Sequence, residues 1–229
     1  MYYKHLDKRL TKLKKQIKKL FLRYKATMKF DELNVIRSTK ELYKELQKLN
    51  EEAFLDIAND IYREEFPESK QRLDKKWLMA ILLAYDPITK YVYEHEVDRK
   101  QARLYEAILS SKTRNKEFMT AFNLWFKQTA QYGITISDSA IVEAFKRQGI
   151  EYVRWNAEID DRTCGVCKER NGKIYRIDKI PSKTHYNCRC WLTKVEKWWK
   201  KLDVLIVRES YSKLKDKHKS VSSVQNVRR

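Results

Sequence analysis

The chain has 229 residues, which is enough for one large domain or for one domain with a small appendage. Hydrophobic residues make up 42% of the chain, which excludes a disordered protein, and charged residues make up 35%. Glycine (4) and proline (3) are scarce, so the composition favours long helices over many short strands.

The formal net charge of +19 is concentrated at the two ends of the chain. Residues 1–29 hold eleven Lys/Arg against one acidic residue and residues 194–229 hold eleven against four, so the stretch between them is nearly balanced. This distribution predicts that both ends contact a polyanion, with DNA, bound non-specifically, as the first candidate and an acidic protein surface as the second. The alternative is that the lysines only solvate helix faces. We assign nucleic-acid binding to Lys12, Lys14, Lys15, Lys18, Lys19, Lys200 and Lys201.

The first ten residues are polar and contain no apolar stretch typical of a secretory signal. The longest apolar run, residues 77–85, is much shorter than the ~20 residues that span a bilayer. We therefore expect a soluble protein that is made in a cytoplasm and has no membrane partner.

The N-terminal segment carries apolar residues at alternating spacings of four and three, which is a heptad seam on one face of a helix. Because lysine fills most other positions, this helix would be marginal alone and its seam needs a partner. We expect packing against a later helix of the same chain. The alternative is a neighbouring subunit, which would make an oligomer through this helix. The seam consists of Leu6, Leu10, Leu13, Ile17, Leu20 and Tyr24.

Several further helices are predicted by apolar periodicity and by residues suited to helix ends. Pro67 suits the first turn of a new helix, Ser137 suits an N-cap, and Gly149 suits the position just after a helix. The predicted ranges are 31–66, 67–85, 88–110, 113–132 and 138–148.

The sequence changes character after Gly149. Residues 152–156, 173–177 and 190–195 read as three short strands, and Asn171-Gly172 is a strong turn dipeptide before the second of them. A last basic helix is predicted from about residue 195, followed by a loose tail. The fold class is therefore α+β and predominantly helical, with a small β unit between helices.

All four cysteines lie within 27 residues, as a C-x-x-C pair followed by an H-x-x-C-x-C group. The short gap lets both thiolates of the first pair face one point, and the turn at residues 171–172 returns the chain to the second group. Such a sulfur and nitrogen set predicts one structural zinc ion. Disulfides or unligated thiols are the alternatives, and a cytoplasm disfavours disulfides. The candidate ligands are Cys164, Cys167, Cys188 and, as the fourth, His185 or Cys190.

The sequence shows no arrangement typical of a catalytic site, and we expect no enzyme. It contains no G-x-S-x-G, no glycine-rich phosphate loop and no H-E-x-x-H. A metal-dependent nuclease or toxin would use Glu158, Asp160 and Asp161, but we expect this acidic run to cap a turn through backbone N–H groups. A zinc-ribbon DNA-binding regulator is a further alternative.

The residues around the cysteines form a longer pattern. It comprises Trp155, the Asp-Asp-Arg-x-Cys-x-x-Cys run of residues 160–167, the Asn-Gly-Lys turn at residues 171–173 and the His-x-Asn-Cys-Arg-Cys end at residues 185–190. Together these elements resemble the C-terminal signature of phage Mu F-like head-morphogenesis proteins, also called minor head or minor capsid proteins. In relatives an Arg-Thr-Glu motif often lies upstream, where this chain has Ser137-Asp138-Ser139.

The resemblance implies a virion component of a tailed phage or prophage, located in the head interior and, during assembly, in the bacterial host cytoplasm. It implies the portal protein, other capsid proteins and packaged DNA as partners. It also implies two regions: residues 1–135 as a variable helical region with a basic N-terminus, and residues 136–229 as the Mu F-like domain. Some members lack the first cysteine pair, so the metal would be an accessory of the fold.

Overall fold

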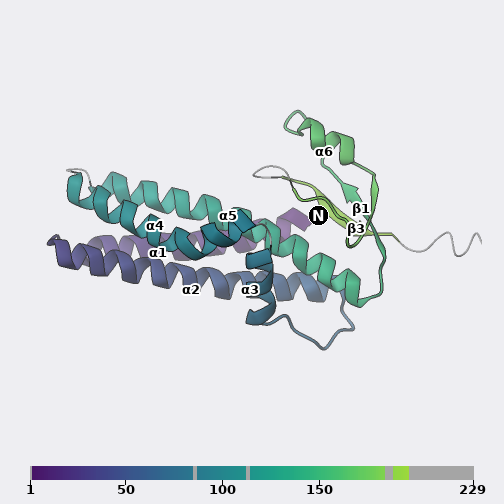
Figure 1. Ribbon diagram of the computed structural model, residues 1–229, viewed down its shortest axis with the longest axis horizontal. Helices are drawn as coiled ribbons and strands as arrows, with labels where there is room; N and C mark the ends of the chain where they lie inside the picture. The colour runs from purple at the N-terminus through teal and green to yellow at the C-terminus, as the bar shows by residue number, and fades with distance from the viewer. Residues whose placement is uncertain (1, 85–86, 112–113, 184–187, 196–229) are drawn as a thin grey trace, which may run out of the picture.

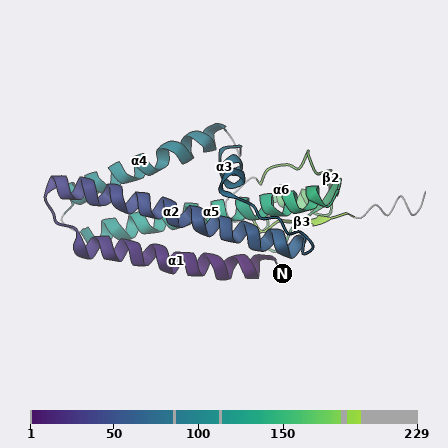
Figure 2. The same ribbon diagram turned by 90° about the horizontal axis from the view of Figure 1, so that it is seen from below.

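A computed structural model describes residues 2–84, 87–111, 114–183 and 188–195. Four long helices form an elongated body: α1 (Tyr2–Thr27), α2 (Glu32–Glu65), α4 (Pro87–Ser110) and α5 (Arg114–Arg147). In it α2 packs against α5, while α1 and α4 each contact both of them and form opposite edges of the body (Figures 1 and 2). The β unit lies at the end of the body away from the α1–α2 connection.

The heptad seam of α1 is buried inside the chain. Leu13 and Ile17 are 1% and 0% exposed and join a core cluster with Leu46 of α2 and Trp125 of α5. Farther along, α1 and α5 approach so closely that a Cβ on Gly133 would lie 3.0 Å from the Leu10 side chain. The expected packing within the chain is therefore confirmed, and an oligomer would need a surface other than this seam.

The segment after α2 does not start a new helix at Pro67, as the sequence predicted. Helix α2 ends at Glu65, and α3 (Lys75–Ala84) begins only after Asp74, whose Oδ1 accepts a hydrogen bond from Trp77 N at 2.8 Å. Between them, the side-chain amide of Asn59 bonds both backbone groups of Leu73, at 2.8 and 2.9 Å. This long-range anchor holds the connection between α2 and α3 against α2, and local proline preference does not reveal it.

The predicted break before residue 138 is also wrong, because α5 runs without interruption from Arg114 to Arg147. Ser137 does not cap a helix; it is 0% exposed in the interior of α5. The β-branched stretch around it has weak helix propensity, yet Ile136 and Ala140 are fully buried in the core cluster shared with the sheet. Tertiary packing thus overrides local propensity at this point.

The end of α5 follows the sequence prediction. Gly149 has a φ of +72°, which suits a residue without a Cβ. Ile150 N donates to Phe145 O and Gly149 N donates to Lys146 O, both at 3.0 Å, which is the Schellman pattern. This turn directs the chain out of the body and into the sheet.

Three short strands form an antiparallel sheet in the order β2-β1-β3, as expected from the three alternating segments. They are β1 (Tyr152–Asn156), β2 (Ile174–Arg176) and β3 (Trp191–Lys194). Val153 and Trp155 of the central strand are buried on the core side. A short helix, α6 (Gly165–Arg170), which the sequence analysis did not anticipate, connects β1 to the Asn171-Gly172 turn. The predicted last helix and tail lie outside the described residues.

No helix in the described part of the chain combines the length and the apolar character that crossing a membrane requires.

Candidate metal centre

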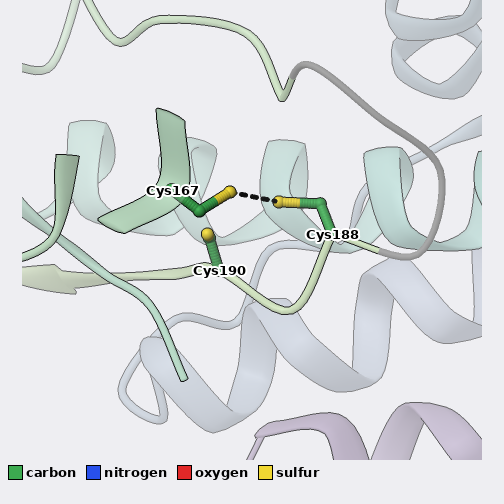
Figure 3. Close-up of side chains that lie close together, drawn as sticks. All are labelled: Cys167, Cys188 and Cys190. Atoms are coloured by element: carbon green, nitrogen blue, oxygen red, sulfur yellow. Dashed lines mark hydrogen bonds between the residues drawn. The ribbon is translucent and has the colours of Figure 1, made fainter. Parts of the chain in front are cut away.

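Three cysteines from two distant segments converge beneath the sheet. Cys167 lies in α6, whereas Cys188 and Cys190 immediately precede β3. Their Sγ atoms all lie within 4.8 Å of one another, and all three side chains are buried (Figure 3). The Sγ atoms of Cys167 and Cys188 are 3.7 Å apart. The sulfur atoms therefore face a common point. Of the three ligands that the sequence favoured most, Cys167 and Cys188 belong to this group and Cys164 does not, while Cys190, an alternative for the fourth ligand, does.

This spacing suits a tetrahedral zinc ion. With Zn–S bonds of about 2.3 Å, a tetrahedron places two ligand sulfurs about 3.8 Å apart. The 3.7 Å separation of Cys167 and Cys188 agrees with that edge. Three thiolates leave one position of a tetrahedron open, so a fourth protein ligand would be needed to close the set, as is typical of structural rather than catalytic zinc.

Cys164 lies at the rim of the same cluster. It is the N-cap of α6, where its Sγ accepts a hydrogen bond from Cys167 N at 3.4 Å. Together with Cys167 and Cys190 it lines a cavity of about 20 Å³. The two-residue gap between the cysteines thus forms the first turn of a helix. The N–H···S bond favours a thiolate at Cys164, which makes this residue suited to be the fourth ligand.

Burial raises the pKa of the Cys167 thiol, and the neighbouring sulfur groups of Cys190, Cys164 and Cys188 raise it further. Burial likewise raises the pKa of Cys190. These thiols therefore keep their protons at neutral pH when no cation is bound, and a metal must displace them. Its affinity consequently falls as the pH is lowered.

The indole of Trp155 supplies a second sign that the cluster is built for thiolates. Its Nε1 is buried and makes no standard hydrogen bond. It lies close enough to Cys190 for its N–H to favour the thiolate of that residue. A neutral thiol is a weak acceptor, whereas a metal-bound thiolate would satisfy this buried donor.

An ion pair ties the two cysteine segments together. Arg189, between Cys188 and Cys190, donates to both carboxylate oxygens of Asp160, and its Nη1 lies 2.7 Å from Oδ2. Asp160 also accepts from Arg162 N at 2.9 Å. The hydrogen bond from Arg189 is the main reason that the pKa of Asp160 lies well below its usual range. The predicted turn-capping role is thus confirmed for Asp160, and Arg189 is the partner that sequence reasoning missed.

A buried ion pair anchors the segment that leads to the second cysteine group. Lys183 Nζ lies 2.6 Å from Asp138 Oδ2 of α5, with side chains 7% and 18% exposed. Burial raises the pKa of Asp138, although Lys183 opposes this shift. No local sequence pattern around Asp138 predicts that it pairs with Lys183, 45 residues away.

The remaining predicted site residues are distributed as follows. Lys12, Lys15 and Lys19 are exposed on α1, as are Lys14 and Lys18. Lys14 Nζ lies 4.9 Å from the centre of the Phe126 ring. His185, Lys200 and Lys201 lie outside the described residues, and their assignments stay predictions.

Comparison with known proteins supports the resemblance found in the sequence. Residues 126–193 match the family model described as Phage Mu protein F like protein. The match spans the second half of α5, the sheet and all four cysteines, and it leaves residues 1–125 unmatched. This region is thus similar to a family of phage proteins. No curated protein and no solved structure gives a significant match.

We predict that the purified chain contains about one zinc ion and that Cys188→Ser abolishes it, because removing one thiolate opens the closed set. Metal content is measured by elemental analysis after gel filtration. Val166→Ser is the matched control, since Val166 is 41% exposed and lies in the gap between two cysteines. Wild-type protein that carries no metal and keeps its thermal stability in a chelator would contradict the prediction.

We predict that Arg189→Gln weakens zinc binding roughly 10- to 100-fold without changing its stoichiometry, the effect typical of losing a group that positions the ligands. The measurement is competition with a chromogenic chelator at pH 7. Arg162→Gln serves as the control, because the Arg162 side chain is 80% exposed and also pairs with Asp160. Equal affinity in all three proteins would show that the Arg189–Asp160 pair does not position the ligands.

Proposed function

We propose that the protein is a minor head protein of a tailed phage or prophage that binds the portal and the packaged DNA during head morphogenesis. The observation that carries this proposal is the family match over residues 126–193. The buried thiols that converge within the same region complete the family signature in space. The N-terminal helices, which lie outside the match, then provide surfaces for partners.

A structural metal ion, bound by Cys167, Cys188 and Cys190 with Cys164 or His185, fits this role better than a catalytic one. Within the described residues these thiols are the one group of potential ligands that converges on a point, and they are buried. Asp160, which a nuclease would need, is engaged by Arg189 and by the backbone of its own turn. The metal would supply the folding energy that three short strands do not provide.

Non-specific DNA binding is assigned to α1. Helical spacing places Lys12, Lys15 and Lys19 on one face, opposite the buried seam, and none of them forms an ion pair with a described residue. Residues 1–29 contain only one acidic residue to offset their charge. Such a face attracts the phosphate backbone without reading the base sequence. Lys200 and Lys201 would extend this contact from the other end of the chain.

The proposed role predicts where the chain is found. In the phage that encodes it, we expect mass spectrometry to detect the chain in purified DNA-filled heads and cross-linking to join it to the portal. Heads assembled with Cys188→Ser in place of the wild-type chain should contain less of it, because the metal-free unit folds poorly. A chain that is abundant in the host lysate but missing from purified heads would refute the proposal.

The DNA assignment predicts a salt-dependent affinity. Replacing Lys12, Lys15 and Lys19 by Gln should reduce the slope of log K against log salt by about 2 to 3, since each neutralised phosphate contributes about 0.9. The affinity is measured by fluorescence anisotropy with a short duplex of arbitrary sequence. The control variant replaces Lys40, Lys44 and Lys48, which are exposed on α2, and so loses the same charge from a different helix. An equal loss in both variants would assign binding to net charge rather than to α1.

A further inference from the structure

Residues of α4 and α5 line a groove of about 440 Å³. Helix α4 forms the edge of the body opposite to α1 (Figure 2). Leu104 and Ala107 of α4 line one wall, and Ala121 and Leu124 of α5 line the other. Leu124 is 54% exposed, so part of its side chain is available in the groove to an apolar partner. The two alanines leave space between the walls for an incoming side chain or helix.

Cations surround this apolar surface. Arg99 and Arg103 lie one turn apart on α4, Lys127 lies on α5, and all three are exposed. Lys100 also lines the groove, where its Nζ bonds Gln128 and lies 5.1 Å from the centre of the Trp125 ring. Glu117 is the only acidic residue among the described residues of the lining. The groove therefore combines an apolar floor with a positive rim.

We infer that this groove binds an acidic amphipathic helix of another protein. A helix laid between α4 and α5 would cover Leu124 with its apolar stripe and bring its carboxylates to Arg99 and Arg103. Guanidinium groups pair with carboxylates through two parallel hydrogen bonds, which fixes orientation as well as charge. The inference goes beyond the proposed function, because it names the chemistry of a partner and does not depend on DNA binding.

A nucleic acid fits this groove less well than it fits α1. The exposed face of α1 presents lysines with few apolar neighbours, as a phosphate backbone requires. A phosphate backbone laid over the groove would leave Leu124 in contact with water. The described lining also offers no exposed aromatic ring on which a base could stack. The apolar floor is thus the feature that favours a protein helix.

The chain's own C-terminal end is also a poor occupant. Residues 194–229 hold eleven Lys/Arg against four acidic residues, so their charge has the same sign as the rim. The acidic complement must come from another molecule. Because α1 occupies the opposite edge of the body, DNA and this partner can bind at the same time.

The test uses a synthetic helical peptide of about 18 residues with leucines on one face and glutamates elsewhere, binding to the full chain in fluorescence anisotropy. A second peptide has the same composition with the leucines distributed around the helix. We expect the amphipathic peptide to bind at least about tenfold more tightly than the second one, since only it covers Leu124. Equal binding of the two peptides would overturn the inference.

Charge-reversal variants locate the binding surface. Arg99→Glu with Arg103→Glu should weaken the amphipathic peptide at least about tenfold, while Lys12→Glu with Lys15→Glu, the same charge change on α1, should alter it less than about twofold. A peptide with lysines in place of glutamates should regain binding to the groove variant. Equal losses in the two variants would overturn the inference, as would a groove variant that keeps the peptide but loses duplex DNA.

An uncharged variant separates a misfolded chain from a lost contact. Leu124→Gln should weaken the peptide several-fold and leave the circular dichroism of the helices unchanged, because Leu124 is largely exposed. Unchanged peptide binding by this variant would reject the apolar floor as part of the site. If the wild-type protein does not bind DNA, only the DNA-binding role of α1 is refuted. The groove inference is tested separately, because the peptide measurements contain no DNA.

Discussion

The close approach of Cys167 to Cys188 joins two segments that are 21 residues apart in the sequence. One segment belongs to α6 and the other leads into β3, so this contact links the two connections that flank the β1–β2 and β1–β3 pairs. The Arg189–Asp160 ion pair repeats the same connection outside the sulfur cluster. A unit with strands of five, three and four residues buries little apolar surface by itself, and its cohesion depends on these polar and sulfur contacts.

The C-terminal unit is attached to the helical body mainly through α5. The first half of this helix contributes Phe122 and Trp125 to the cluster that holds α1 and α2. Its second half contributes Ile141 and Phe145 to the cluster that includes Trp155 and the buried cysteines. The family match begins within this same helix, at residue 126, so the matched and unmatched regions meet inside one continuous element. The two regions therefore share a core.

Much of this arrangement was predictable from local patterns. The α1 seam, the three strands and the turn at Gly149 each depend on residues that are close in the sequence, and the structure confirms them. The cysteine spacing predicted a sulfur cluster, but it favoured Cys164 over Cys190, and the structure groups Cys190 with Cys167 and Cys188. Long-range contacts carried no such signal. The Asn59 anchor on Leu73, the burial of Ser137 and the Arg189 and Lys183 ion pairs all depend on partners that only the folded chain brings near.

The uninterrupted course of α5 has a mechanical consequence. Its 34 residues correspond to a rod about 50 Å long, since an α-helix rises 1.5 Å per residue. Lys127 on the groove and Asp138 beside the cysteine unit lie on this one rod without a hinge between them. Whatever holds one end therefore fixes the distance and direction of the other. The groove and the cysteine unit therefore keep a fixed separation along the body.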